Sequence, residues 1–303
     1  MTRTTRRAAA LAGAVALLAA GLVAGPASTT LPSADAASSV SLTPVTITSP
    51  KLPRRPPFLT NPVTIRVTDE MGELKLSRSR DYRIVLPTNR AWKNARGLFI
   101  TGGHNVVVLG GTVDVRGGWK DGSGKVVKRA AYFRDSTGIV HVEGLRFLSS
   151  TTQRLTEGID ISLPGAYLRL FNVRISSLLT GSQSTNHADV IQAWAGPRSL
   201  LVDGLTAATQ YQGMFLTPQQ HSSASVGLYD LRRVWIDGRN ASYLLWRNGS
   251  FPVRTSEVHV TGSTRQSSGL WPHRSSWPYV KVSRPSHMFG GTAGLGYSSP
   301  GYL

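Results

Sequence analysis

The feature that most constrains the fold of this 303-residue chain is a short pattern that recurs every 28 to 33 residues. Each copy has a branched apolar residue, two mostly polar or small residues, and then a further small or apolar residue. The leading residues of successive copies are 33, 28, 32, 29 and 29 apart, and they are Leu109, Val142, Leu170, Val202, Leu231 and Val260. Periods of 20 to 50 residues are typical of solenoids, propellers and other repeat arrays.

Strand signals fill each repeat, and no helical segment interrupts them. Runs such as VTIRV (63–67) and YRIVL (82–86) alternate apolar and polar residues, with Gly, Asn or Asp between the runs. A leucine-rich repeat needs a Leu/Asn consensus that is missing, and a propeller blade needs four strands in roughly 40–45 residues. A β-sandwich is the remaining alternative, although its loops should vary more in length. We therefore predict an all-β chain in which residues 63–264 form a parallel β-helix, a solenoid with strands stacked about 4.8 Å apart.

Three stretches of the repeat region resemble a known group of proteins. They are NARGLFITGGHNVVVLGGTVDVRGG (94–118), STGIVHVEGLRF (136–147) and YLRLFNVRI (167–175), and they look like rungs of right-handed parallel β-helix proteins of the pectin-lyase-like superfamily. The resemblance covers about residues 63–264 and implies a right-handed coil. It does not imply one activity, because that superfamily includes lyases, glycoside hydrolases, esterases, epimerases, phage tailspikes and adhesins.

The segments on either side of the repeats predict an exported protein. Residues 1–36 read as a signal peptide, with a basic start, an Ala/Leu/Val-rich run over 8–25 and a small-x-small cleavage site at Ala34-Asp35-Ala36. An uncleaved anchor is the alternative, and the route of export, general or twin-Arg, stays open. We expect a secreted, extracellular or cell-wall-associated monomer with no stable membrane insertion after cleavage.

Two further segments complete the predicted organisation. Residues 37–62 form a Pro/Ser/Thr-rich linker and an N-terminal extended segment, in which each Pro favours extended backbone. Residues 265–303 are rich in aromatic residues, Pro and Gly, and we expect a C-terminal covering tail, because the end of an open β-helix exposes unpaired strand edges.

The charge of the chain bears on its partners. The formal net charge is +18 and there is no Cys, so stability must come from packing and backbone hydrogen bonds. A basic surface attracts polyanions, and for an exported protein we expect an extracellular, acidic polysaccharide and no nucleic acid. Solubility and adhesion to the cell wall are the alternative reasons for the charge.

Stacking of equivalent positions on adjacent turns indicates where a site would lie. We align the segments 157–161, 189–193 and 212–216, and less closely 242–246. One parity should then point into the core: Ile159, Ile161, Ile191, Ala193, Met214, Leu216 and Leu244. The opposite parity gives an outward column: Asp160, Ser162, Gln192, Trp194, Phe215, Thr217 and Arg247. Such a mixture suits sugar binding, although a solvent face covered by a terminal segment is the alternative.

A second polar column lies at the bend before these strands. It contains Glu157, Asp189 and Gln212, and His187 lies two residues before Asp189 in the stretch NHADVIQAW. A buried, unpaired carboxylate is costly, so these groups either turn outwards or find partners. The corner is thus either a structural cap of the bend or a functional site.

We assign hypothetical roles to these residues. The catalytic candidates are Asp189, His187, Glu157 and Asp160, and the substrate-binding candidates are Gln192, Trp194, Tyr211, Gln212, Arg154 and Arg247. A hydrolase would use two of the carboxylates. Resemblance to the superfamily's lyases implies instead a possible Ca²⁺ ion on Glu157, Asp160 and Asp189, with an Arg or Lys base. The dense Asp clusters of those lyases, and the Asp-Asp and Gly-His-Gly motifs of polygalacturonase-like hydrolases, are both missing.

The sequence thus predicts a polysaccharide-active protein, a carbohydrate lyase or glycoside hydrolase. The alternative is a non-catalytic protein that binds glycans or attaches to the cell wall, similar to an adhesin or a tailspike. The sugar, the linkage and the dependence on a metal stay open.

Overall fold

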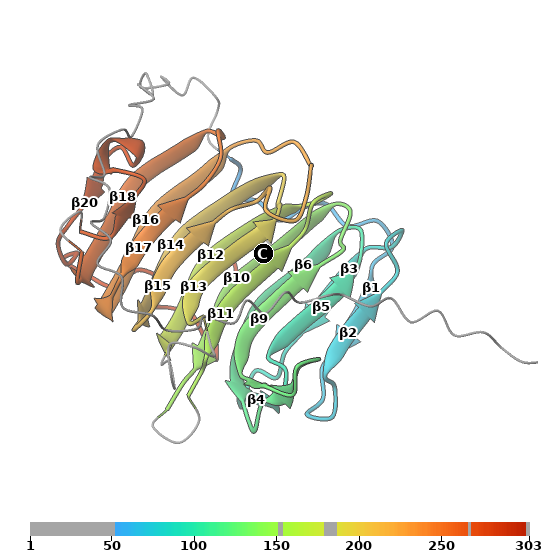
Figure 1. The fold of residues 1–303 in the computed structure, drawn as a ribbon. Helices are drawn as coiled ribbons and strands as arrows, with labels where there is room; N and C mark the ends of the chain where they lie inside the picture. Colours follow the sequence, from blue (N-terminus) through green and yellow to red (C-terminus); the bar gives the residue numbers. More distant parts are fainter. Residues whose placement is uncertain (1–51, 151–153, 179–186, 266–267, 301–303) are drawn as a thin grey trace, which may run out of the picture. The chain divides into compact units, whose positions relative to one another are not determined.

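The strands of the chain wind into a right-handed parallel β-helix in the computed structural model (Figure 1). The structure describes residues 52–150, 154–178, 187–265 and 268–300. The predicted signal peptide and most of the linker lie outside these ranges, as do residues 179–186 of the loop before His187. No helix in the described ranges is long and apolar enough to cross a bilayer.

The larger of the two main sheets has ten strands, nine of them in one parallel series, and β4 pairs beside β6. In spatial order the strands are β1 (Val63–Arg66), β3 (Tyr82–Val85), β6 (Val106–Val115), β10 (Ile139–Leu148), β12 (Tyr167–Leu178), β14 (Ser199–Thr209), β16 (Tyr229–Ala241), β18 (Val253–Ser263) and β20 (Val280–Lys281), with β4 (Trp92–Asn94) off this path. Neighbouring strands on this path come from successive turns of the coil, so their order in the sheet follows their order in the sequence.

The smaller main sheet has eight strands, all parallel, in the order β2 to β19 along the coil. They are β2 (Glu73–Leu76), β5 (Leu98–Gly102), β9 (Arg129–Arg134), β11 (Glu157–Ser162), β13 (Asp189–Ala195), β15 (Gln212–Leu216), β17 (Tyr243–Arg247) and β19 (Leu270–Trp271). An antiparallel hairpin, β7 (Trp119–Lys120) and β8 (Val126–Val127), leaves the coil between β6 and β9. One 3₁₀ turn, η1 (Arg274–Ser276), follows β19.

A stack of residues with left-handed backbone interrupts the long strands of the ten-stranded sheet. The residues with positive φ on successive turns are Gly110, Gly144, Asn172, Gly204, Arg233 and Glu257. Pairing lapses at most of these positions and resumes beyond them, so each long strand bends there. Gly and Asn adopt this conformation at little cost, which explains four of the six residues.

This stack corrects part of the repeat alignment. Val108, rather than Leu109, lies in register with Val142, and Thr255, rather than Val260, continues the column after Leu231. Because the sequence pattern begins the last copy at Val260, it predicts Gly262 in the column of Gly144 and Gly204. In the structure Gly262 also has positive φ, but Glu257 occupies the stacked position.

The predicted inward residues form the core between the two main sheets. Relative exposure is 0–1% for all seven: Ile159, Ile161, Ile191, Ala193, Met214, Leu216 and Leu244. The register of the last segment differs by one from the alignment, because Met214 pairs with Leu245 and Phe215 pairs with Trp246.

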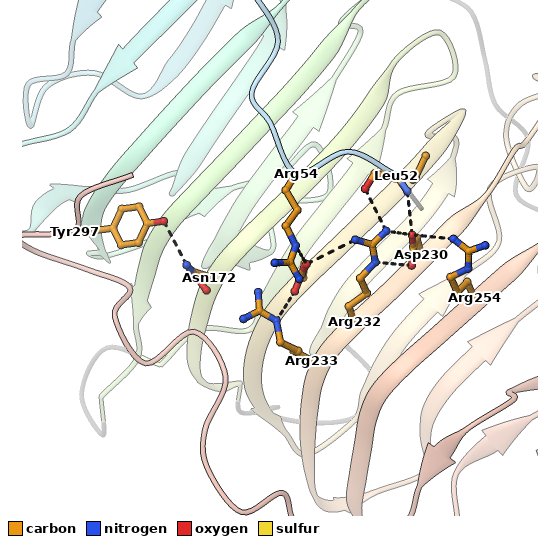
Figure 2. A network of polar contacts seen from close by, with 9 residues as sticks. Leu52, Arg54, Asn172, Asp230, Arg232, Arg233, Arg254 and Tyr297 are labelled. Atoms are coloured by element: carbon orange, nitrogen blue, oxygen red, sulfur yellow. Dashed lines mark hydrogen bonds and ion pairs between the residues drawn. The ribbon is translucent and has the colours of Figure 1, made fainter. Parts of the chain in front are cut away.

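A strap of residues 52–60 runs along the outer face of the ten-stranded sheet (Figure 2). The N–H of Leu52 donates to Asp230 (3.2 Å) and the Thr60 N–H donates to Asp81 (2.7 Å), so the strap reaches from β16 back to the residue just before β3. Between them, Arg54 forms an ion pair with the buried Asp203 (2.5 Å). Extended backbone before each Pro suits this course.

The C-terminal tail covers another part of the same sheet. Thr206 donates to the carbonyl of Phe289 (2.8 Å), and the Gly294 N–H donates to the carbonyl of Gly144 (2.8 Å). Tyr297 donates to Glu143 (2.6 Å). The expected covering tail therefore exists, but it reaches back to the early turns, and before doing so it adds β19 and β20 to the two sheets.

Candidate functional site

The outer face of the eight-stranded sheet carries the predicted polar column. Register places Tyr132, Asp160, Gln192, Phe215, Trp246 and Trp271 in one line along the coil. Equivalent positions stack because the strands are parallel and in register. Outward positions of six successive strands, from β9 to β19, thus meet on one surface.

Aromatic side chains dominate this line, and we call Phe99, Tyr132, Trp194, Phe215, Trp246 and Trp271 the aromatic row. In its first half, the Phe99 and Tyr132 rings are 5.0 Å apart, and Tyr132 and Trp194 are 5.7 Å apart. In its second half, Phe215 and Trp246 are 5.8 Å apart and Trp246 stacks on Trp271 at 5.1 Å. Trp271 is 40% exposed, so the end of the row is open to solvent.

A buried ionic cluster lies beneath the first half of the row. Arg129 on β9 contacts Glu157 (2.6 Å) and also forms an ion pair with Asp160, while its guanidinium lies 4.8 Å from the Tyr132 ring centre. The guanidinium therefore closes over both carboxylates, and Asp160 is only 1% exposed although its register position faces outwards. Of the two carboxylates predicted at the bend, Glu157 is therefore held by a neighbouring cation, and the same cation holds Asp160 of the outward column.

Asp189 lies in the same cluster without a cation of its own in the described residues. Its side chain is 1% exposed, and no hydrogen-bond partner among the described residues reaches Oδ1. Burial raises the pKa of Asp189 well above its usual value, and the charges of Asp160 and Glu157 raise it further. Burial also raises the pKa of Asp160, against the opposing effect of Arg129. With one guanidinium among three carboxyl groups, the cluster tends to keep a proton.

His187 and Tyr211 form an aromatic pair at the edge of this cluster. The exposed His187 ring lies parallel to the Tyr211 ring, at 5.4 Å and 5°. Burial, and after it the charge of Asp189, raises the pKa of Tyr211. Gln212 pairs with Asp189 across β13 and β15. The structure thus brings His187, Asp189, Tyr211 and Gln212 together.

The two arginine candidates lie apart from one another. Arg247 donates to the carbonyl of Phe251 (2.6 Å) and its guanidinium lies 4.9 Å from the Phe251 ring centre, so it is bound to the following loop. Burial lowers the pKa of Arg247. Arg154 is exposed and precedes β11.

The three carboxyl groups do not fit a calcium site. No group of three or more His, Asp or Glu side chains in the described ranges is arranged to hold a metal ion. A Ca²⁺ ion needs six to eight oxygen ligands, and here Arg129 already occupies the space between Glu157 and Asp160.

An open pocket of about 470 Å³ lies beside the second half of the row. We call it the amide pocket, after the side chains in its lining, which are Phe215, Thr217, Gln219, Gln220, Trp246, Asn248 and Gly249. Its volume is in the range of sites for small ligands, roughly 300–1,000 Å³.

Several residues of this surface escaped the sequence analysis. Trp246 was placed one position out of register, and Trp271 was assigned to the covering tail. Tyr132 and Arg129 lie one turn before the first aligned segment. Extending the column back to RAAYFR (129–134), whose alternation matches EGIDIS (157–162), would have found both.

Comparisons with protein-family models, with curated proteins and with solved structures gave no match. The stacked parallel strands agree with the coil that the resemblance implied, and the family itself stays a prediction.

Proposed function

We propose that this protein binds a polysaccharide along the outer face of its eight-stranded sheet. The aromatic row carries the proposal, because sugar rings present C–H faces that pack on aromatic side chains while their hydroxyl groups reach polar neighbours. Gln192 lies in line with Phe215 of the aromatic row and supplies such a neighbour. Export, predicted from residues 1–36, would bring the protein to extracellular polymers.

Coverage of the other sheet supports this choice of face. The strap and the C-terminal tail lie on the ten-stranded sheet, where Asp203 and Asp230 are fully buried beneath their arginine partners. The aromatic row keeps Trp271 exposed and has a pocket beside it. An extended polymer therefore has room on the eight-stranded sheet.

Affinity electrophoresis of the purified protein in gels containing soluble polysaccharides tests the proposal. At least one polysaccharide should retard the protein, and Trp194→Ala and Trp246→Ala should each weaken the affinity about tenfold, which corresponds to a loss of about 1.4 kcal/mol. Tyr279→Ala is the matched control, because Tyr279 is 83% exposed and lies outside the row. Equal retardation of all four proteins would refute the assignment of the surface.

Hydrolysis of the bound polymer is a second candidate function, favoured by Asp189. A carboxyl group whose pKa is raised by burial can act as a general acid, and Glu157 on the adjacent turn supplies the second carboxylate of a hydrolase. The alternative reaction is the elimination that a lyase performs, which needs a cation and a base at the substrate. The two nearby arginines have other partners, since Arg247 is bound to Phe251 and Arg129 to two carboxylates, so the contacts favour hydrolysis.

Two signals separate these reactions. New reducing ends without ultraviolet absorbance at the unsaturated uronate band indicate hydrolysis, and both signals together indicate a lyase. If the protein hydrolyses its ligand, Asp189→Asn and Glu157→Gln should each lower the rate about a hundredfold or more while leaving retardation in gels unchanged. Binding without either signal would leave a glycan-binding protein and exclude the enzyme.

A further inference from the structure

We propose that the amide pocket binds an uncharged sugar unit, a neutral pyranose, and discriminates against uronates. This inference rests on the proposed function, since it concerns one subsite of the same polysaccharide surface. The net charge of +18 predicts an acidic polymer, and this inference is the opposite of that prediction.

The shape of the pocket suits a ring with one apolar and one polar side. The Phe215 and Trp246 rings are 5.8 Å apart and open at 43°, so they form a wedge rather than a closed stack. Three amide side chains, those of Gln219, Gln220 and Asn248, complete the lining. Amides both donate and accept hydrogen bonds, which matches the hydroxyl groups of a sugar.

The polar wall is held in place by the backbone. The Gln220 N–H donates to the carbonyl of Thr217 (2.9 Å), and the Asn248 N–H donates to the carbonyl of Leu216 (3.0 Å). Thr217 also donates from its hydroxyl to the side-chain oxygen of Gln220 (2.9 Å). This bond directs the Gln220 amide and leaves its NH₂ group as the donor for a ligand.

The lining contains no charged residue, and the nearby cations have other partners. Arg247, next to Trp246 in sequence, donates to the carbonyl of Phe251. Arg134 and Arg129, on earlier turns of the same sheet, pair with Asp135 and with the buried carboxylates. A uronate entering the pocket would lose water from its carboxylate without meeting a cation among the lining residues, because Arg247 directs its guanidinium to the carbonyls of Phe251 and Gly249; this loss of water is unfavourable.

Isothermal titration calorimetry with matched ligands tests the inference. The probes are oligosaccharides of polygalacturonate and of hyaluronate, each before and after reduction of the uronate carboxyl groups to primary alcohols, together with neutral glucan, galactan, mannan and xylan oligosaccharides. We expect the best neutral ligand to bind at least tenfold more tightly than any uronate, and each reduced ligand to bind more tightly than its parent.

A charge introduced into the pocket provides the second arm. Gln219 is exposed, so Gln219→Arg should fold normally, and it should raise the affinity for the uronate probes at least fivefold. Ser223→Arg adds the same charge at an exposed position outside the lining and should leave the preference unchanged.

The outcomes separate this inference from the function on which it rests. Uronates that bind the unaltered protein as tightly as neutral ligands would overturn the neutral subsite and leave polysaccharide binding standing. Neutral binding that survives Trp246→Ala would also overturn it, by placing the ligand elsewhere. Failure of every glycan to bind would overturn both.

Discussion

Asn in place of Asp189 should make the folded protein more stable at neutral pH, and the gain should grow as the pH rises. Asp189 is 1% exposed, its Oδ1 has no hydrogen-bond partner in the described residues, and two further carboxyl groups lie near it. Asn is nearly isosteric with the protonated acid and cannot ionise. The substitution therefore removes the free-energy cost of burying the Asp189 carboxylate or of keeping it protonated above its usual pKa.

The sign follows from the raised pKa. Between the usual carboxyl pKa of 3.8 and the raised folded value, the folded protein keeps a proton on Asp189 that the unfolded chain releases. The free energy of unfolding of the native sequence then falls as the pH rises through this window, by up to about 1.4 kcal/mol per pH unit for one proton. Asp160, whose pKa is also raised, adds to this slope in both proteins.

The assay is urea unfolding followed by tryptophan fluorescence and circular dichroism, from pH 4 to pH 8. At pH 4 the two proteins should have similar midpoints, and at higher pH the Asp189→Asn midpoint should exceed the native one by a growing margin. Asp121→Asn, at a half-buried carboxylate that accepts a hydrogen bond from Ser123, is the control that should show no such trend. Parallel midpoint curves for Asp189→Asn and the native sequence would refute the reasoning.

Three further changes test other parts of the structure by the same unfolding assay. Arg129→Met leaves buried carboxylates without their cation and should cost about 3–5 kcal/mol at pH 7 and less at pH 4.5, where protonation relieves them; an equal loss at both pH values would contradict this. Tyr297→Phe removes the hydroxyl donor to buried Glu143 and should cost about 1–3 kcal/mol, and no loss would show that the tail is not held there. Glu257→Asn places a residue tolerant of left-handed backbone at φ 55° and should raise the free energy of unfolding by about 1 kcal/mol; a lower midpoint would contradict the strain argument.

The coil and its inward parity could be predicted from the sequence because period-2 alternation and a recurring spacing are local signals. Ile159, Ile161 and Met214 are buried as predicted, since each lies in a strand whose pattern specifies its face. Glu257 could not be predicted in this way. A charged residue in a left-handed position has no sequence signature, so the pattern begins the last copy at Val260, whereas Thr255 is the residue in register with Leu231.

The polar cluster could be predicted only in part, because the partners come from different turns. Glu157 and Asp189 were placed in one column, which register confirms, but Arg129 lies a turn earlier in a segment that the alignment did not reach. Burial of Asp160 could not be derived from its outward parity, since a guanidinium and a tyrosine ring from β9 cover it. Likewise, net charge did not reveal that many arginines are bound to buried acids.

The distribution of those arginines decides how the surface should be interpreted. Asp203 is fully buried and is contacted by Arg54 and Arg233, and Asp230 is contacted by Arg232 and Arg254, so these charges stabilise the strap and the ten-stranded sheet. Arginines that pair with internal carboxylates attract anions only weakly at the aromatic row, and the lining of the amide pocket there is uncharged. A strongly basic chain can therefore present a neutral binding face. Calorimetry that compares a uronate with its reduced form tests whether the total charge of the chain or the local lining of the pocket governs recognition.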